Sequence, residues 1–594
     1  QFPSDPLSPT NPGWGSPGEC HFWGEPETGY HRAEDPWVIR RDLQMLSNAK
    51  VDFIYIDVTN GIAYLETIKK LCEISMQMRK EGTYTPQIVF TTHSYSGRMM
   101  NEIYDEFYAN SLFKDLWFKW NGKPVMLGDE ADPELRPDVK NFFTIKFCWA
   151  WTKTKALPNH WQWLDGYPQN YGWSVNKNSP EQIPVSMAQH PTSTRGTSFH
   201  GGVEPAVNPQ YLTDYTGQGL HAVEQWTRAL AVDPPVIMVT QWNEWFAQRF
   251  IWDQGAGTYG GRPIKNGDSY FVDAFTEEFN RDMAPMKGGH TDNYYYQLIS
   301  NIRKYKGMAA PPAYSASKTA HIDGDFSEWP SVLPVFKDPF GDTMHRNFRG
   351  YDPSVTYVNN TGRNDILESK ATYDESRLYF YVRTAQVMTP YSDPNWMLLF
   401  LDTDKSKTTG WEGYDYVLNL GVKSDTETTL KQWNGSEWVN EITIPYKYAG
   451  SEMELSVPRA AVRMDSTIPA FYFHWADNPQ QLNDITTFFT DGESAPDRRF
   501  NYYFSPSVSD AVVQTPYHAT FTVYPNPVTD KMTINSERYQ VENVKIVDLQ
   551  GKTVYSNNEH FNGKKTIDIR LEKGLYLLNL TGDVPYASQK FIVE

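Results

Sequence analysis

The segment Val239–Trp245 (VTQWNEW) joins a short apolar run to a polar and aromatic end. A hydrophobic strand that ends in polar residues is typical of a barrel enzyme, which carries its active site at the carboxyl ends of its strands. Glu244 lies there between Trp242 and Trp245, and apolar walls favour the protonated carboxyl group that a general acid needs. Asn243 could hydrogen-bond that carboxyl group or a substrate hydroxyl. The alternative is that Glu244 only completes a structural network at the barrel mouth.

Aromatic residues make up 15% of the chain, with 20 Trp and 37 Tyr. An aromatic face offers apolar area beside polar edges, which suits stacking on sugars, although a chain rich in β-structure also favours Tyr and Trp. The rings that we expect at the mouth, as platforms or hydrogen-bonding groups, are Trp23, Trp149, Trp151, Trp163, Trp242, Trp245, His93 and His190. These side chains predict a carbohydrate ligand.

Hydrolysis of a glycosidic bond usually needs two carboxyl groups. Asp57 is the best partner for Glu244 by position, because it ends a strand within the apolar run Val51–Val58 and precedes Asn60, a candidate substrate ligand. The alternative role of Asp57 is to cap the next helix. Glu130 follows another apolar strand and is a further candidate. This chemistry requires no cofactor.

Strand and helix signals alternate over residues 1–307. Asp35 followed by Pro36 is typical of a helix start, and continuous apolar runs indicate buried parallel strands. About seven such units match an α/β TIM-like (β/α)8 barrel, whereas a doubly wound sheet would need a glycine-rich phosphate loop that is absent from the sequence. Near the end of this region, Glu277 and Arg281 have the i,i+4 spacing of an ion pair on a solvated helix face.

The pattern changes after the predicted barrel. Residues 308–317 (MAAPPAYSAS) predict a linker. Short alternating runs separated by turns predict an all-β sandwich over residues 318–508 and a small C-terminal all-β domain over residues 516–594.

The charge and the cysteines exclude several classes of protein. A formal net charge of −18 without a basic stripe excludes nucleic acid as a partner. No apolar run has the length of a transmembrane segment. Cys20, Cys72 and Cys148 have no CxxC spacing and form neither a metal site nor a disulfide framework. We expect Gln1 to be a mature N-terminus, left after removal of a leader.

Residues 23–61 (WGEPETGY through DVTNG) and the VTQWNEW segment resemble the glycoside hydrolase family 71 and 99 type of barrel, in the bacterial form with an NEW motif at a late strand. The resemblance covers roughly residues 15–305 and implies a (β/α)8 barrel that acts on α-linked glycans such as α-mannan or α-glucan. The family 99 pattern has a second catalytic Glu three residues after the first, where this chain has Ala247. Only Glu244 carries over, so the second carboxyl group or the reaction itself differs here.

The segments HIDGDFSEWP and LLFLDTDKSKTTGWEGYDYVLN resemble the family 9 type of carbohydrate-binding module, over about residues 318–505. Asp402, Asp404 and Ser406 place oxygen atoms at alternate positions, as at the start of a calcium loop. The Gly and Glu that complete an EF-hand are absent. A structural Ca²⁺ in the sandwich and a solvated loop therefore both stay open.

The tail contains FTVYPNP at residues 521–527, followed by VKIVDLQGKTVY and GLYLLNL. These motifs resemble the C-terminal sorting domain of the Bacteroidetes type IX secretion system. The resemblance implies the type IX secretion machinery as a partner, and a protein that is secreted or attached to the outer-membrane surface.

These features together predict a secreted glycoside hydrolase that cleaves a polysaccharide or complex glycan by carboxylate acid/base catalysis. The alternative is a non-catalytic surface glycan-binding protein, which the residue Ala247 supports. A structural or adhesive protein would have no use for the tryptophans at the predicted barrel mouth. A peptidase is excluded by the lack of HExxH and GxSxG motifs.

Overall fold

The computed structural model gives the fold of most of the chain. The structure describes residues 16–149, 157–189, 195–203, 216–259, 262–271, 276–308, 311–465, 468–506, 521–548, 552–558, 560–582 and 587–593. The chain forms two compact units, of which the first holds Gln1–Ile299 with Ala313–Ser509 and the second holds Ser300–Pro312 with Asp510–Glu594. The α/β region and the β-sandwich therefore belong to one unit, and the tail to another.

Among the described residues, six strands of the α/β region run parallel in two sheets. One sheet has the order β3-β4-β6 with β7 beside β6, and the other pairs β8 with β9. Their bounds are β3 (Phe53–Asp57), β4 (Gln87–Thr91), β6 (Lys123–Leu127), β7 (Thr144–Lys146), β8 (Gln182–Ser186) and β9 (Val236–Thr240). These are the apolar runs that the sequence marks as buried parallel strands.

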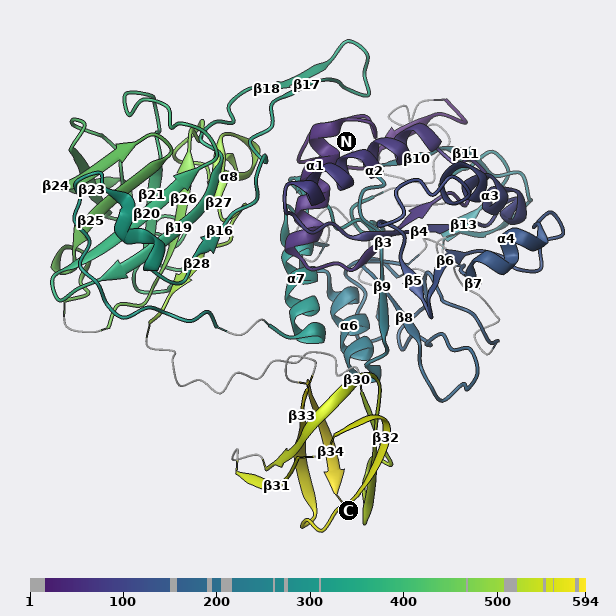
Figure 1. The fold of residues 1–594 in the computed structure, drawn as a ribbon. Helices are drawn as coiled ribbons and strands as arrows, with labels where there is room; N and C mark the ends of the chain where they lie inside the picture. Colours follow the sequence, from purple (N-terminus) through teal and green to yellow (C-terminus); the bar gives the residue numbers. More distant parts are fainter. Residues whose placement is uncertain are drawn as a thin grey trace. The chain divides into compact units, whose positions relative to one another are not determined.

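Helices surround these strands (Figure 1). Asp35 caps the first helix by accepting the backbone N–H of Trp37 at 3.1 Å, with Pro36 at the first helical position, as its sequence predicts. The helices are α1 (Pro36–Asn48), α2 (Leu65–Lys80), α3 (Ser96–Ile103), a π-helical turn (Tyr104–Tyr108), α4 (Pro137–Phe142), α6 (Leu220–Val232) and α7 (Asn293–Lys306). None of the described helices combines the length and the apolar character needed to cross a membrane.

The two parallel sheets share one core. Inward side chains of both sheets form a single apolar cluster that includes Val89, Leu127 and Met238. The hydroxyl of Tyr55 on β3 lies 2.6 Å from that of Thr240 at the end of β9. The sheets thus curve around a common interior. In the described part, hydrogen bonds join four parallel strands in one sheet and two in the other, and do not close a ring of eight.

Short antiparallel pairs complete this region. They are β1 (Cys20–Phe22) with β10 (Phe246–Gln248), β2 (Glu25–Pro26) with β15 (Met286–Lys287), β5 (Lys119–Trp120) with β6, β11 (Phe250–Ile251) with β14 (Ser269–Tyr270), and β12 (Gly257–Tyr259) with β13 (Arg262–Ile264).

The predicted helix with a solvated Glu277–Arg281 pair is wrong, because residues 276–285 are not helical and Arg281 is completely buried.

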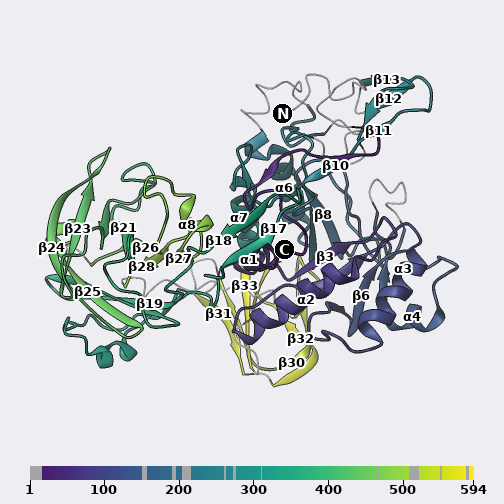
Figure 2. The same cartoon turned by 90° about the horizontal axis from the view of Figure 1, so that it is seen from above.

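The β-sandwich is built from one continuous set of hydrogen-bonded strands folded into two layers. Its path is β16 (Phe336–Lys337), β19 (Ile366–Tyr373), β20 (Arg377–Thr384), β25 (Glu452–Pro458), β24 (Trp438–Ala449), β23 (Glu427–Trp433), β22 (Tyr416–Leu418), β21 (Leu398–Asp402), β26 (Phe471–Asp477) and β27 (Glu493–Ala495), with β28 (Tyr502–Phe504) also on β26. Residues 438–445 of β24 pair with β23 and residues 446–449 pair with β25, so this strand belongs to both layers. Figure 2 shows β24 next to both of these strands. A large core that includes Phe380, Leu399 and Trp475 fills the space between them.

Two smaller elements lie beside the sandwich strands. The hairpin of β17 (Arg346–Arg349) and β18 (Thr356–Asn359) reaches the α/β region, where Arg346 binds Asp35 at 2.8 Å. The short helix α8 (Thr487–Thr490) precedes β27. Arg498, which follows β27, donates to both carboxylate oxygens of Glu27 at 2.8 Å. We call this contact region between sandwich and α/β region the seam.

The tail folds around a core of its own. Its strands are β29 (Thr522–Tyr524), β30 (Lys531–Val547), β31 (Thr553–Asn557), β32 (Phe561–Asp568), β33 (Gly574–Gly582) and β34 (Ala587–Val593). The long β30 pairs with four of the other five strands, and the core of the tail includes the buried Ile534 of β30 together with Leu578 and Phe591.

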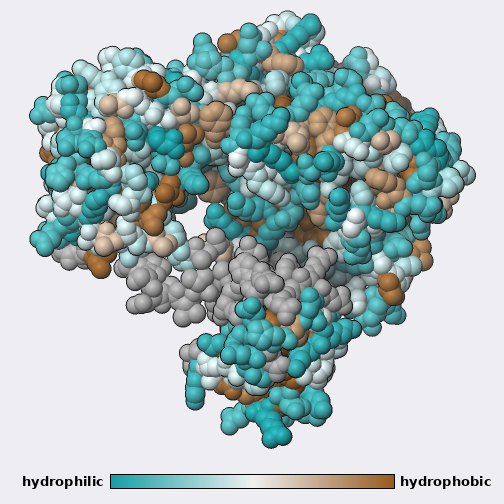
Figure 3. All heavy atoms as spheres, viewed as in Figure 1, coloured by the Kyte–Doolittle hydropathy of each residue, from teal (hydrophilic) through white to brown (hydrophobic). Residues whose placement is uncertain are grey.

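On the face of the whole molecule that Figure 3 shows, hydrophilic residues predominate and hydrophobic ones are scattered.

Candidate active site at the strand ends

The parallel register brings the expected site residues to the carboxyl ends of the strands. Asp57 pairs with Thr91, Thr91 with Leu127, and Leu127 with Lys146. In the second sheet Ser186 pairs with Thr240. The candidates Asp57, His93, Glu130, Trp149 and Glu244 all lie at these ends or in the loops that follow them.

Glu244 sits in a network with a buried cation. Its side chain is 35% exposed, and its Oε2 lies 3.8 Å from Nη2 of Arg281, whose side chain is 0% exposed. Gln241 bridges the pair, since its amide donates to Glu244 and its carbonyl oxygen accepts from Nε of Arg281 at 2.7 Å. A guanidinium beside a carboxylate stabilises the ionised form, so the surroundings of Glu244 differ from the purely apolar walls that the sequence predicts.

The backbone of Glu244 is held from two sides. Its N–H donates to Asp282 at 2.7 Å, and the indole N–H of Trp23 donates to its carbonyl oxygen at 2.8 Å. Asp282 is completely buried, like its neighbour Arg281. These two residues position Glu244. They were missed because their spacing imitates an amphipathic helix, and a local pattern does not show which distant residues the fold brings to Glu244.

A line of rings leads from His93 to this network. His93 stacks on Trp149 with 3.6 Å between ring centroids, and Trp149 lies 6.0 Å from Trp163. The guanidinium of Arg281 in turn lies over Trp163 at 5.4 Å. His93 is exposed and Trp149 half-buried, so this end of the line is open to a ligand. Partial burial lowers the pKa of His93, and the charge of Asp129 partly opposes that shift.

Two of the expected platforms are core residues instead. Trp23 and Trp245 are 1% and 4% exposed and stack on each other with 5.1 Å between centroids. Neither has a face free for a sugar, so their prediction as substrate ligands is wrong. Trp242 is half-buried against the same cluster and lies 6.2 Å from Tyr295. A Trp next to a site in sequence can thus serve packing alone.

Asn243 faces away from the carboxyl group that it was expected to bind. Its amide donates to Asp42 on α1 at 3.2 Å. Burial raises the pKa of Asp42 to about 7, against hydrogen bonds from Trp242 and Asn243 and the charge of Arg41.

The remaining candidates carry local interactions. Asp57 is exposed, and its Oδ1 accepts the N–H of Thr59 at 2.8 Å, which closes a local turn. The alternative that Asp57 caps the next helix is wrong, because the N-cap residue of α2 is Tyr64. Asn60 and Glu130 are exposed in their loops. Trp151 and His190 lie outside the described residues.

The calcium loop predicted in the sandwich brings its acidic groups together. Carboxylate oxygens of Asp402, Asp404 and Asp415 lie within 4.8 Å of one another. Their oxygens also accept backbone N–H groups of the same loop, among them those of Lys405 at 2.6 Å, Ser406 at 2.9 Å and Thr403 at 2.8 Å. The donor chemistry fits Ca²⁺. Asp415, which the sequence pattern missed, joins the two predicted ligands.

Comparison with known proteins identifies the tail. Residues 522–594 match the family described as the secretion system C-terminal sorting domain. This match confirms the predicted sorting domain, and with it a protein that is secreted or attached to the cell surface. No curated protein matches the chain.

Two solved structures resemble about half of the chain. One is the GH99 endo-alpha-mannosidase from Bacteroides thetaiotaomicron in complex with BIS-TRIS-Propane, at 12% identity and a TM-score of 0.30, covering 48% of this chain and 88% of that chain. The other is also described as the GH99 endo-alpha-mannosidase from Bacteroides thetaiotaomicron. It has 14% identity and a TM-score of 0.29, covering 48% of this chain and 86% of that chain.

Proposed function

We propose that the protein is an exported glycoside hydrolase with an eight-stranded (β/α) barrel, in which Glu244 is the carboxylate that acts on a polysaccharide or complex glycan. The observation that carries this proposal is the half-exposed Glu244 at the end of β9, positioned by Gln241 and Arg281 beside a line of aromatic rings. A carboxylate on a rigid strand end with stacking platforms next to it matches what a sugar-cleaving site requires.

The charge next to Glu244 points to its role. Because Arg281 stabilises the ionised carboxylate, Glu244 suits the nucleophile or the electrostatic stabiliser of an oxocarbenium-like transition state. The proton donor is then a second carboxyl group, for which Asp57 and Glu130 at neighbouring strand ends are the candidates. His93 and Trp149 provide the platform for a sugar ring.

The proposal is tested by reducing-sugar release from a panel of α- and β-linked glycans. We expect the wild-type protein to cleave at least one of them and Glu244→Gln to lose that activity. Glu66→Gln, an exposed glutamate of α2, is the matched control and should behave as wild type. Unchanged cleavage by folded Glu244→Gln would rule out the assigned role.

A non-catalytic glycan-binding protein is the second candidate, because of one specific observation. Ala247, at the position of the second Glu in the family 99 pattern, is 2% exposed and packs with Phe271 and Phe279. The second carboxyl group of that pattern is therefore absent from this chain. If the wild-type protein binds glycans in a pull-down assay and cleaves none, this second function is correct.

A further inference from the structure

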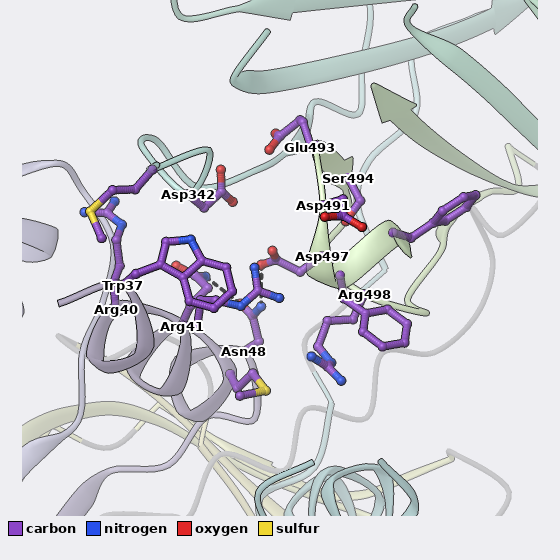
Figure 4. Close-up of a pocket in the computed structure, with 16 residues that line it drawn as sticks. Trp37, Arg40, Arg41, Asn48, Asp342, Asp491, Glu493, Ser494, Asp497 and Arg498 are labelled. Atoms are coloured by element: carbon purple, nitrogen blue, oxygen red, sulfur yellow. Dashed lines mark hydrogen bonds between the residues drawn. The ribbon is translucent and has the colours of Figure 1, made fainter. Parts of the chain in front are cut away.

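Three acidic residues from distant parts of the sandwich meet at the seam. Asp338 follows β16, Asp342 lies in the loop before β17, and Glu493 begins β27. Their carboxylate oxygens lie within 4.8 Å of one another. We call these three residues the seam cluster. They line or adjoin a pocket whose other wall is formed by α1 residues such as Trp37 and Arg41 (Figure 4).

Several oxygens of this cluster are buried without a hydrogen-bond partner among the described residues. They are both carboxylate oxygens of Asp342 and Oδ2 of Asp338. Asp365 adds a fourth carboxyl group, which is 8% exposed and has an unpartnered Oδ1, while its Oδ2 accepts the N–H of Gly341 at 2.8 Å. Figure 4 shows the carboxyl groups of Asp342 and Glu493 turned toward the same space. Buried carboxyl groups left in this state are unfavourable unless a cation or protons compensate them.

Two of the three arginines that line the pocket have acidic partners, and the third, Arg41, lies over the ring of Trp37 at 4.5 Å. Arg40 donates to Glu81 at 2.7 Å and to the carbonyl oxygen of Phe340 at 2.6 Å. Arg498 forms the double hydrogen bond with Glu27. Burial, together with the charges of the neighbouring acids, holds the pKa of Asp338, Asp342 and Glu493 well above the usual range.

We propose that the seam cluster binds a divalent cation, Ca²⁺, through carboxylate oxygens of Asp338, Asp342 and Glu493, with Asp365 as a further or bridging ligand. Calcium takes six to eight hard oxygen ligands in a flexible geometry, so water and backbone oxygens would complete the shell. The site is distinct from the Asp402 loop and does not depend on the proposed glycosidase activity.

Such a cation would hold the sandwich against the α/β region. The loop that carries Asp342 also carries Phe340, whose carbonyl oxygen binds Arg40 of α1. The segment that begins with Glu493 continues to Asp497, which accepts a hydrogen bond from Asn48 of α1 at 2.7 Å. One ion that joins these two segments would therefore fix both at the surface of α1.

The test is calcium binding by the full chain after dialysis against EDTA. Isothermal titration with CaCl₂ should give one more bound equivalent for wild type than for Asp342→Asn, while Asp404→Asn in the other acidic loop keeps the seam equivalent. Terbium luminescence excited through tryptophan provides an independent readout, since Trp37 lines the pocket. Loss of the equivalent in Asp342→Asn supports the site; equal stoichiometry in wild type and folded Asp342→Asn overturns it.

The sign of the stability change distinguishes a cation site from ordinary packing. Asp342→Asn removes one of several like charges, so its melting temperature should exceed that of wild type in EDTA and fall below it in millimolar CaCl₂. A merely structural aspartate would lower the melting temperature under both conditions, which would contradict the proposal. Asp338→Asn is the second variant if Asp342→Asn does not fold, and the same reversal is expected of it.

Discussion

The strand ends around Glu244, which we call the mouth, and the seam surround their carboxyl groups differently. At the mouth, Glu244 is partly open to solvent and has the buried Arg281 as its counter-ion. At the seam, carboxylate oxygens of Asp342 and Asp338 are shielded from solvent, and two of the three arginines that line the pocket are held by Glu81 and Glu27. The paired and partly open carboxylate is the basis of the proposed glycosidase site, and the buried like charges are the basis of the proposed metal site.

The strongest test of this comparison measures the activity and the stability of one variant from each region. Glu244→Gln should lower kcat/KM by about 10³-fold, because it removes the carboxylate that is proposed to act on the substrate. It should also lower the melting temperature, because it removes the charge beside the buried Arg281. Asp342→Asn should leave kcat/KM within about twofold in CaCl₂ while changing stability. A seam variant that abolishes cleavage without unfolding would break the separation between the two regions.

Trp245→Ala should destabilise the protein by about 3 kcal/mol or more, because it empties the buried stack with Trp23 beneath the mouth. The measurement is chemical unfolding followed by circular dichroism. Trp149→Ala, which truncates a half-buried ring, is the comparison and should cost far less. An equal loss of unfolding free energy in the two variants would contradict the assignment of Trp245 to the core and of Trp149 to the ligand platform.

The next prediction concerns Asp42 on α1, the helix that contacts both the loop of Glu244 and the seam. Its pKa is raised to about 7, against 3.8 for an unfolded chain, so the stability that its neutral form provides is complete below about pH 4 and disappears as the pH rises through 7. Asp42→Asn should therefore be more stable than wild type at pH 8, by roughly 1–3 kcal/mol, and similar at pH 4. Unfolding curves at both pH values check this, and a constant difference would show that burial of the charge is not the cause.

The smallest expected effect is on substrate affinity. Trp149→Ala should raise KM for a cleaved glycan about 3- to 10-fold and change kcat little, because it removes a stacking face remote from the reacting atoms. A large fall in kcat with KM unchanged would instead place Trp149 in the transition state. Tyr84→Ala, an exposed ring at the opposite ends of the strands, serves as the control.

Local patterns in the sequence predicted the elements well and the site in part. The apolar run before Asp57 is a parallel strand, Asp35 and Pro36 begin α1, and the tail motif identifies a sorting domain. His93, Trp149, Trp163 and Glu244 do lie at strand ends in one network. The substrate roles of Trp23 and Trp245 were wrong, because adjacency to a motif does not reveal which face of the chain the side chain occupies.

The sequence by itself determined which segments form strands and helices, because periodicity, capping residues and turn residues act over a few neighbouring positions. Only the tertiary structure decided that Arg281 joins Glu244, and that Asp338, Asp342 and Glu493 meet at one point. These partners are far apart along the chain, and their contacts arise from the packing of whole elements. Whether a charged side chain is solvated, paired or in need of a metal ion is therefore settled after folding.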